Sequence, residues 1–186
     1  MDTLMLILLF IVIVMCVIIG LYINYYNKLQ DYIIRINEVE SILDNNLREK
    51  FDNLNKAVTI IKSSDYIDEE VDKKMFEDIV KLRNRKISNF DLDRKLIDST
   101  TKFISMKEKY NELKTNKEII TISKNLDELD EVLAVNRDYY NKNIAEYNKL
   151  VAVFPTNIVA RLCKYNEKLY YDKKDMSDDD FNDFKL

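Results

Sequence analysis

Glycine and proline are almost missing from this sequence, which has one of each among its 186 residues. Antiparallel sheets are joined by tight turns, and those turns depend on residues that accept positive φ or fix φ in advance. Helices joined by loops of Asn, Ser and Asp do not need such residues. The length suits one domain with a modest core. We therefore predict an all-α fold.

Other absences exclude whole classes of site. The sequence has no histidine, which removes His-based triads and most zinc sites. A nucleotide-binding loop needs several glycines, and Gly20 is the only one. Cys16 and Cys163 form neither a CxxC pair nor a disulfide framework. Charges of both signs are mixed and sum to −4, unlike a nucleic-acid-binding surface. We expect no catalytic residue, cofactor, metal ion or nucleic-acid partner.

The segment from Leu4 to Ile23, "LMLILLFIVIVMCVIIGLYI", contains no charged residue. As a helix it spans roughly 30 Å, the thickness of the hydrocarbon core of a membrane. A buried core helix is the alternative, but a fully apolar core helix rarely exceeds about 14 residues. We predict a transmembrane anchor over residues 1–24 that contacts the lipid bilayer through residues 4–23. No basic segment or small-x-small site predicts its cleavage.

The charges beside this segment predict its orientation. No Lys or Arg precedes it, whereas Lys28 and Arg35 follow it closely. Basic residues next to a span favour the cytoplasmic side. We therefore expect a single-pass protein of the cell membrane, with the N-terminus outside and the helical body in the cytoplasm.

The periodicity of apolar residues predicts four helices. The first continues from the span to Ser63-Ser64-Asp65, the second covers about 67–86, and the third begins with Asp91 as its cap. The third is expected to carry Leu92, Leu96, Phe103, Tyr110 and Leu113. The inward positions of the first helix follow steps of three and four residues: Leu29, Ile33, Ile36, Val39, Leu43, Leu47, Phe51, Leu54, Val58 and Ile61.

The fourth predicted helix runs from about Lys117 to Phe154, and Pro155 ends it. Its seam has a coiled-coil-like heptad spacing, with these residues at intervals of seven: Leu133, Tyr140, Tyr147 and Phe154. Together the predictions describe a transmembrane helix that continues into an antiparallel four-helix bundle, residues 25–164, with long first and fourth helices.

The unequal helix lengths predict how the chain returns to the membrane. If Ile61 lies level with Lys117, antiparallel packing places Asn27 near Val151, and the chain after Pro155 then lies near the bilayer. We expect interfacial positions for Tyr165, Tyr170 and Tyr171. Residues 165–186 contain a run of acids and few apolar residues, which predicts a disordered acidic tail.

Several motifs resemble the LemA family of bacterial membrane-anchored helical proteins. "YNELKTN" is similar to the family's Tyr-Pro-x-Leu-Lys-Ala-Asn turn, with Asn111 in place of the proline. "ELDEVLAVNRDYYN" and "EYNKLVAVFPTNIVARL" are similar to its two C-terminal segments, and "YYNKL" and "NEVESILDNNLREKFDNL" to its N-terminal ones. The family's Arg-Tyr-Asp-Leu-Ile-Pro is Lys50-Phe51-Asp52-Asn53-Leu54-Asn55 here. The resemblance implies a membrane-anchored four-helix bundle and implies no catalytic activity.

A set of polar and aromatic residues is the candidate site. It is either a cluster that recognises a peptide or lipid headgroup, or a set of seam residues whose side chains fix the register between helices. In the second interpretation, the Tyr-Asn pairs of the fourth helix face the Tyr-Asn pair of the first. Arg137 and Arg161 are candidates for lipid-phosphate contacts. The set comprises Tyr26, Asn27, Asn136, Arg137, Tyr140, Asn141, Tyr147, Asn148, Phe154, Pro155 and Asn157.

Three classes of function follow. The favoured hypothesis is a non-enzymatic scaffold or interaction protein whose candidate partners are membrane proteins. The alternative is an adaptor or regulator of a membrane protease or a cell-envelope process. An enzyme requires convergent titratable groups in a pocket, and the sequence has no nucleophile–base pair or metal-ligand spacing. The sequence does not determine the oligomeric state, since the span has no GxxxG motif.

Overall fold

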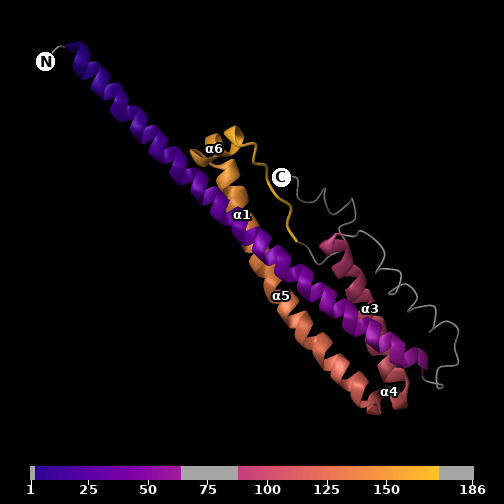
Figure 1. Ribbon diagram of the computed structural model, residues 1–186. Helices are drawn as coiled ribbons and strands as arrows, with labels where there is room; N and C mark the ends of the chain where they lie inside the picture. The colour runs from indigo at the N-terminus through magenta and orange to yellow at the C-terminus, as the bar shows by residue number, and fades with distance from the viewer. Residues whose placement is uncertain (1–2, 64–87, 172–186) are drawn as a thin grey trace, which may run out of the picture. The chain divides into compact units, whose positions relative to one another are not determined.

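The computed structural model describes residues 3–63 and 88–171, and the regular elements in these ranges are all α-helices (Figure 1). This confirms the all-α prediction for the described part of the chain. The second predicted helix, 67–86, and the tail from 172 lie outside the described residues. The helices are α1 (Thr3–Ser63), α3 (Asn89–Lys109), α4 (Asn111–Thr115), α5 (Lys117–Ala152) and α6 (Thr156–Leu162).

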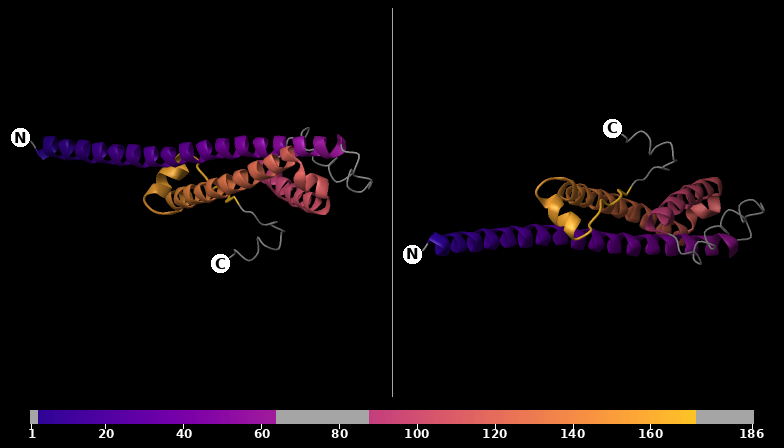
Figure 2. Two further views of the ribbon diagram at one scale, coloured as in Figure 1. Left: turned by 90° about the horizontal axis from the view of Figure 1, so that it is seen from below. Right: turned by 90° about the horizontal axis from the view of Figure 1, so that it is seen from above.

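Helix α1 is one uninterrupted helix of 61 residues, as both views of Figure 2 show. The predicted continuation of the apolar span into the body is therefore correct. Gly20 does not interrupt it, and the space around this glycine is open. The helix ends at Ser63, whose hydroxyl donates a hydrogen bond of 2.9 Å to the carbonyl oxygen of Ile60.

The start of α3 differs from the prediction. Its N-cap is Ser88 rather than Asp91. The Ser88 hydroxyl oxygen accepts a hydrogen bond of 3.2 Å from the backbone N–H of Asp91, and the hydroxyl donates to the Asp91 carboxylate at 2.7 Å. Ser at the N-cap with an acid three residues later resembles a capping box, in which the N-cap satisfies a backbone donor that the helix leaves open.

The end of α3 also differs, because Tyr110 has extended dihedral angles, φ −109° and ψ 118°. Tyr110 and Leu113 therefore do not belong to the third helix as predicted; Leu113 lies in the separate short helix α4. After α4, the side-chain oxygen of Asn116 accepts hydrogen bonds from the backbone N–H groups of Glu118 and Ile119 at 2.9 and 3.2 Å. Asn116 thereby caps the start of α5.

The long helix α5 ends at Ala152, close to the predicted end at Phe154. The predicted seam stops earlier than expected, because Phe154 is 74% exposed while Leu133 and Tyr147 are buried. Phe154 lies in the turn after the helix, where the heptad spacing no longer sets the direction of the side chain. Pro155 is the N-cap of α6.

The chain divides into two compact units. The first unit comprises Met1–Val39 and Tyr140–Tyr170, and the second comprises Glu40–Tyr139 and Tyr171–Leu186. The core of the first unit joins α1, α5 and α6 through a cluster of buried residues: Leu29, Ile36, Ile144, Tyr147, Val159 and Ala160. The core of the second unit joins α1, α3, α4 and α5, and its most buried apolar residues are Leu43, Leu47, Leu54, Ala57, Val58, Ile61, Leu96, Phe103, Met106, Leu113, Ile119, Leu126 and Leu133.

One position of the α1 seam was predicted incorrectly. The sequence analysis placed Phe51 inward, but the structure fully buries Lys50 and leaves Phe51 half-buried. The steps from Leu47 to Lys50 and on to Leu54 are three and four residues, so Lys50 continues the same helical face. The apolar pattern missed it because a lysine occupies the inward position.

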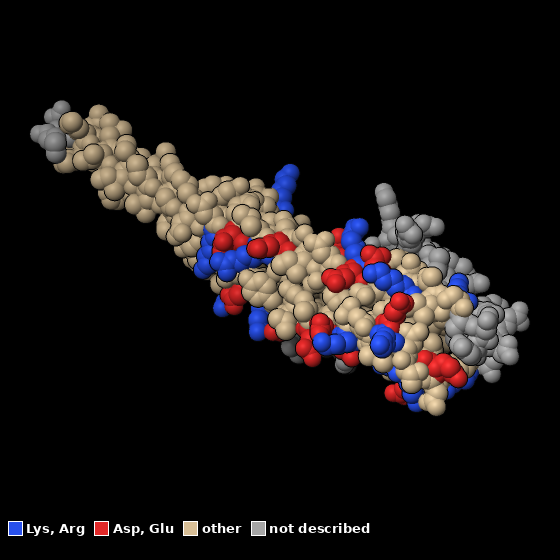
Figure 3. Space-filling view, turned by 60° about the horizontal axis from the view of Figure 1, so that its bottom comes forward, with Lys and Arg blue, Asp and Glu red and all other residues tan. Residues whose placement is uncertain are grey.

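The apolar N-terminal part of α1 is long enough to cross a membrane, and no residue of its most apolar window is buried against the rest of the chain. Figure 3 shows this segment as a surface free of blue and red side chains. Its large side chains are exposed along its length, including Leu4, Phe10 and Ile18. The segment therefore does not pack as a core helix in this structure.

Candidate functional site

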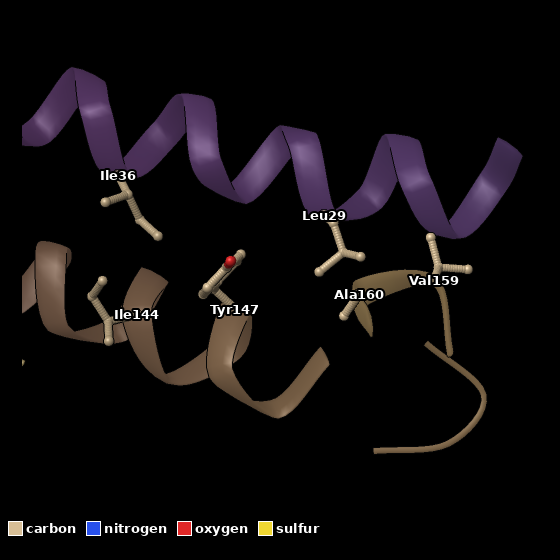
Figure 4. Packing of buried hydrophobic residues seen from close by; sticks show 6 residues of the cluster. All are labelled: Leu29, Ile36, Ile144, Tyr147, Val159 and Ala160. Carbon is tan, nitrogen blue, oxygen red and sulfur yellow. The ribbon is translucent and has the colours of Figure 1, made fainter. Parts of the chain in front are cut away.

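Tyr147 is the centre of the core of the first unit. Figure 4 shows its ring between Leu29 and Ile36 of α1, with Ile144 one turn away on α5. The side chain is 2% exposed, and this burial raises the pKa of its hydroxyl above the ordinary value for tyrosine. Tyr147 therefore occupies a packing position in this cluster.

Asn148 holds the chain that follows α6. Its side-chain N–H donates to the carbonyl oxygen of Lys168, and its side-chain oxygen accepts from the N–H of Lys168, each at 2.8 Å. The amide therefore pairs with one residue of backbone in the way that a neighbouring strand would. These contacts are to Lys168, whereas the seam interpretation placed Asn148 opposite the Tyr26-Asn27 pair.

The other Tyr-Asn residues of the first unit differ in their burial. Tyr26 is half-buried against the core and stacks on Tyr22, with ring centroids 6.3 Å apart. Asn27 is exposed on α1. Tyr140 is half-buried against the same core, and Asn141 is half-buried beside it on α5.

The residues around α6 lie against α1. The Cys163 sulfur is 3.6 Å from the hydroxyl of Tyr22, and Gln30 donates a hydrogen bond to the hydroxyl of Tyr165. Pro155 is half-buried. Asn157 is also half-buried, and its side-chain oxygen is enclosed without a hydrogen-bond partner in the described structure. These contacts place the chain after Pro155 beside the part of α1 between Tyr22 and Gln30.

Arg137 belongs to the second unit and is buried there with an acid. Its guanidinium donates a hydrogen bond of 2.6 Å to Asp93 of α3, and the two residues are 4% and 2% exposed. Asn136, its neighbour, is half-buried and donates to the Val132 carbonyl of its own helix at 2.8 Å. The proposed lipid-phosphate contact of Arg137 is therefore incorrect, since the guanidinium is enclosed by protein. Arg161 is exposed on α6.

Tyr171 completes this buried cluster. Its hydroxyl lies 3.1 Å from the second carboxylate oxygen of Asp93 and 3.3 Å from the carbonyl oxygen of Asn89, both of which are acceptors. The ring packs edge-on against Phe90 and lies 6.0 Å from the Arg137 guanidinium carbon. Burial first, and then the charge and hydrogen bond of Asp93, raise the pKa of Tyr171 far above its ordinary value.

Tyr171 was expected at the membrane interface, within a disordered tail that begins at residue 165. The structure instead gives 165–171 a defined extended course, fastened at Lys168 by Asn148 and at Tyr171 by Asp93. Low apolar content was the reason for expecting disorder, but polar contacts supply the anchoring here. The rest of that tail lies outside the described residues.

Two further polar contacts join helices in the second unit. The fully buried Lys50 of α1 pairs with Asp130 of α5 at 2.5 Å, and Lys107 of α3 donates to the Ser123 hydroxyl of α5 at 2.8 Å. A buried polar group that is paired fixes which residues of two helices face each other. These contacts therefore fix the register between the helices that they join.

An open groove of about 560 Å³ runs between α1 and α5 in the second unit. Its lining includes Lys56 and Thr59 on one side and Lys117 and Thr121 on the other. The residues just before Ile61 and the start of α5 at Lys117 therefore line the same groove. Among the described residues, no three Cys, Asp or Glu side chains gather as metal ligands.

Sequence reasoning did not identify Asp93, Lys168 or Tyr171 as interacting residues. Asp93 had a detectable signal, because it lies three residues before Leu96 on the inward face of α3. Arg137 occupies the corresponding inward face of α5, four residues after Leu133. Opposite charges on two otherwise apolar faces are a sign of a buried ion pair.

The LemA family model matches residues 39–181 of the chain. The match covers most of the body described above, including the Lys50–Asp130 pair and the cluster around Arg137. A comparison with curated proteins found no match.

Proposed function

The chain belongs to the LemA family, and from that premise we propose that it is a single-pass protein of the cell membrane whose helical body is a non-enzymatic scaffold for membrane proteins. The observation that carries the proposal is α1. One continuous helix contains an exposed apolar segment at its N-terminal end and a buried helix-packing face further along.

The energetics favour a membrane for this segment. It holds 15 Leu, Ile, Phe and Val residues, and at roughly 0.3–0.6 kcal/mol each their insertion contributes on the order of 5–9 kcal/mol. The same residues exposed to water would be an aggregation hazard. The helix continues without interruption from this segment into the body.

The non-enzymatic role is supported by what the buried polar groups do. Arg137, Asp93 and Tyr171 contact each other, and Lys50 pairs with Asp130. These groups are occupied in structural contacts and do not converge on the groove. We propose that the body is completed as an antiparallel four-helix bundle by residues 67–86, whose apolar positions Val71, Met75, Ile79 and Leu82 have helical spacing.

Membrane fractionation tests the anchor. We expect the full-length chain, with its N-terminal residues present by intact mass, to stay in the membrane pellet after alkaline extraction. Deletion of residues 4–23 should move the chain to the soluble fraction. A cleaved chain, or a full-length chain that alkaline treatment extracts, would contradict the proposal.

Sidedness and partners need separate measurements. With both native cysteines replaced, a Glu38→Cys variant should react with a membrane-impermeant maleimide only after the cells are opened, because the body is proposed to be cytoplasmic. Labelling in intact cells would show that the body lies outside the cell and would contradict the proposed orientation. Proximity labelling from the body should identify membrane proteins. Recovery of one membrane protease as the dominant partner would instead favour the adaptor alternative.

A further inference from the structure

Helix α6 has one buried face and one exposed apolar face. Thr156, Val159 and Ala160 are buried against the first unit. Ile158 and Leu162 point away from it and are 52% and 68% exposed. They lie four residues apart and so form one stripe on the helix surface. Phe154, in the turn before α6, is 74% exposed and adds a third exposed apolar side chain to this region.

This exposed stripe lies beside the end of the apolar span. Cys163, directly after α6, contacts Tyr22 in the last turn of the span. In Figure 4, Val159 lies beyond Leu29 in the direction of the N-terminus of α1. Figures 1 and 2 agree that α6 lies alongside α1. The stripe is therefore at the level where the span would leave the hydrocarbon core.

The charged residues in the stretch of sequence that contains the stripe are basic. No Asp or Glu occurs from residue 150 to 166, whereas Arg161 and Lys164 lie in this stretch and are exposed. Helices that lie in a membrane interface combine an apolar face with basic residues that meet anionic headgroups. The composition of the α6 region has both properties.

We propose that α6 is an interfacial helix, which places Phe154, Ile158 and Leu162 in the headgroup–acyl boundary of the bilayer that α1 crosses. The proposal rests on the proposed membrane anchor. The bilayer is the occupant because the stripe continues the apolar surface of α1 at its membrane end, and because Arg161 and Lys164 complement anionic lipid. The body is then fixed to the membrane at two places, so that it cannot turn freely about α1.

Site-directed fluorescence tests this in the full-length chain with Cys16 and Cys163 replaced by alanine. Bimane is attached to Ile158→Cys or Leu162→Cys, and the protein is reconstituted in vesicles of phosphatidylcholine and phosphatidylglycerol. The quencher is a lipid with a nitroxide near the top of its acyl chain. A side chain buried about 5–10 Å into the interface should lose at least about half of its fluorescence.

Two labelled positions on α1 serve as references. Val12→Cys lies near the middle of the span and should be quenched strongly by a second lipid whose nitroxide is near the end of its acyl chain. Glu38→Cys is exposed 15 residues beyond Ile23, about 22 Å along the helix, and should be unchanged. In an Arg161→Gln/Lys164→Gln background, quenching at residue 158 should decrease in the anionic vesicles.

The labels on α1 distinguish failure of the membrane anchor from failure of the interfacial helix. Quenching at residue 12 without quenching at 158 and 162 would overturn the interfacial helix and leave the anchor intact. No quenching at residue 12 would overturn the anchor, and the interfacial helix with it. If the label at 158 were shielded from both the nitroxide lipid and aqueous iodide, protein rather than lipid would cover the stripe, and the lipid proposal would be wrong.

Discussion

The buried Arg137–Asp93 pair offers the sharpest test of how the second unit is held together. Replacing Arg137 with methionine keeps most of the volume of the side chain and removes the positive charge. Asp93, which is 2% exposed, then stays buried with only the Tyr171 hydroxyl among its identified partners. A buried carboxylate without its counter-charge is strongly disfavoured.

The expected loss is about 3–5 kcal/mol for Arg137→Met, the usual range when one partner of a buried pair is removed. The double variant Asp93→Leu/Arg137→Met removes both charges and should restore most of the stability, because an apolar pair of similar volume is often neutral or stabilising by about 1–4 kcal/mol. The two substitutions are therefore strongly non-additive.

Hydrogen exchange of the α3 amides measures the loss of stability in the second unit alone. A local measurement is needed because the chain has two compact units, which can differ in stability. A loss of 3–5 kcal/mol corresponds to a roughly 10²- to 10³-fold or greater acceleration of exchange for the amides of Leu96 and Phe103. The full-length protein in detergent is suitable, since both residues lie in the body.

The matched control is Arg35→Met. Arg35 makes an exposed pair with Asp31 on the same helix, at 2.8 Å, and such a pair contributes about 0.3–0.5 kcal/mol. If Arg137→Met accelerated exchange no more than Arg35→Met, or if the double variant were as unstable as the single one, the assignment of the pair as a buried electrostatic contact would be wrong.

Three further predictions concern the contacts beside this pair. Because the folded-state pKa of Tyr171 is raised, the unfolded chain loses this proton first, so stability should fall as pH rises above about 10; denaturant titration should show a weaker fall in Tyr171→Phe. Asn148→Ala removes both bonds to Lys168, so limited proteolysis after Lys168 should become faster, while the exposed Lys149→Ala should leave it unchanged. Ser88→Ala should destabilise α3 by about 1 kcal/mol in exchange measurements, and no change would refute the cap.

The helices themselves were largely predictable because they depend on local patterns. The absence of breakers between Leu4 and Ser63 predicted one helix, and Pro155 marked the end of α5 to within a few residues. The predictions of the α3 boundaries were wrong, because the local sequence there is compatible with more than one start and end of the helix. Ser88 rather than Asp91 caps α3, and a backbone break at Tyr110 divides a stretch that periodicity alone presents as continuous.

The candidate residues were less predictable. Tyr147 is a core residue, as a heptad position suggests, but Phe154 continues the same spacing and is exposed, because the helix has already ended. Arg137 was a candidate for a lipid-phosphate contact because the predicted register returned the fourth helix to the bilayer. Its partner Asp93 is 44 residues away, on another helix.

The sequence by itself determined the all-helical character, the apolar segment and the inward faces, because composition and spacing of three and four residues act within single helices. Only the tertiary structure decided which polar groups meet: Arg137 with Asp93, Lys50 with Asp130, and Asn148 with the backbone of Lys168. Those pairings depend on the register between segments that are 20 to 80 residues apart. A buried polar side chain is stable only where packing brings its partner within hydrogen-bonding distance.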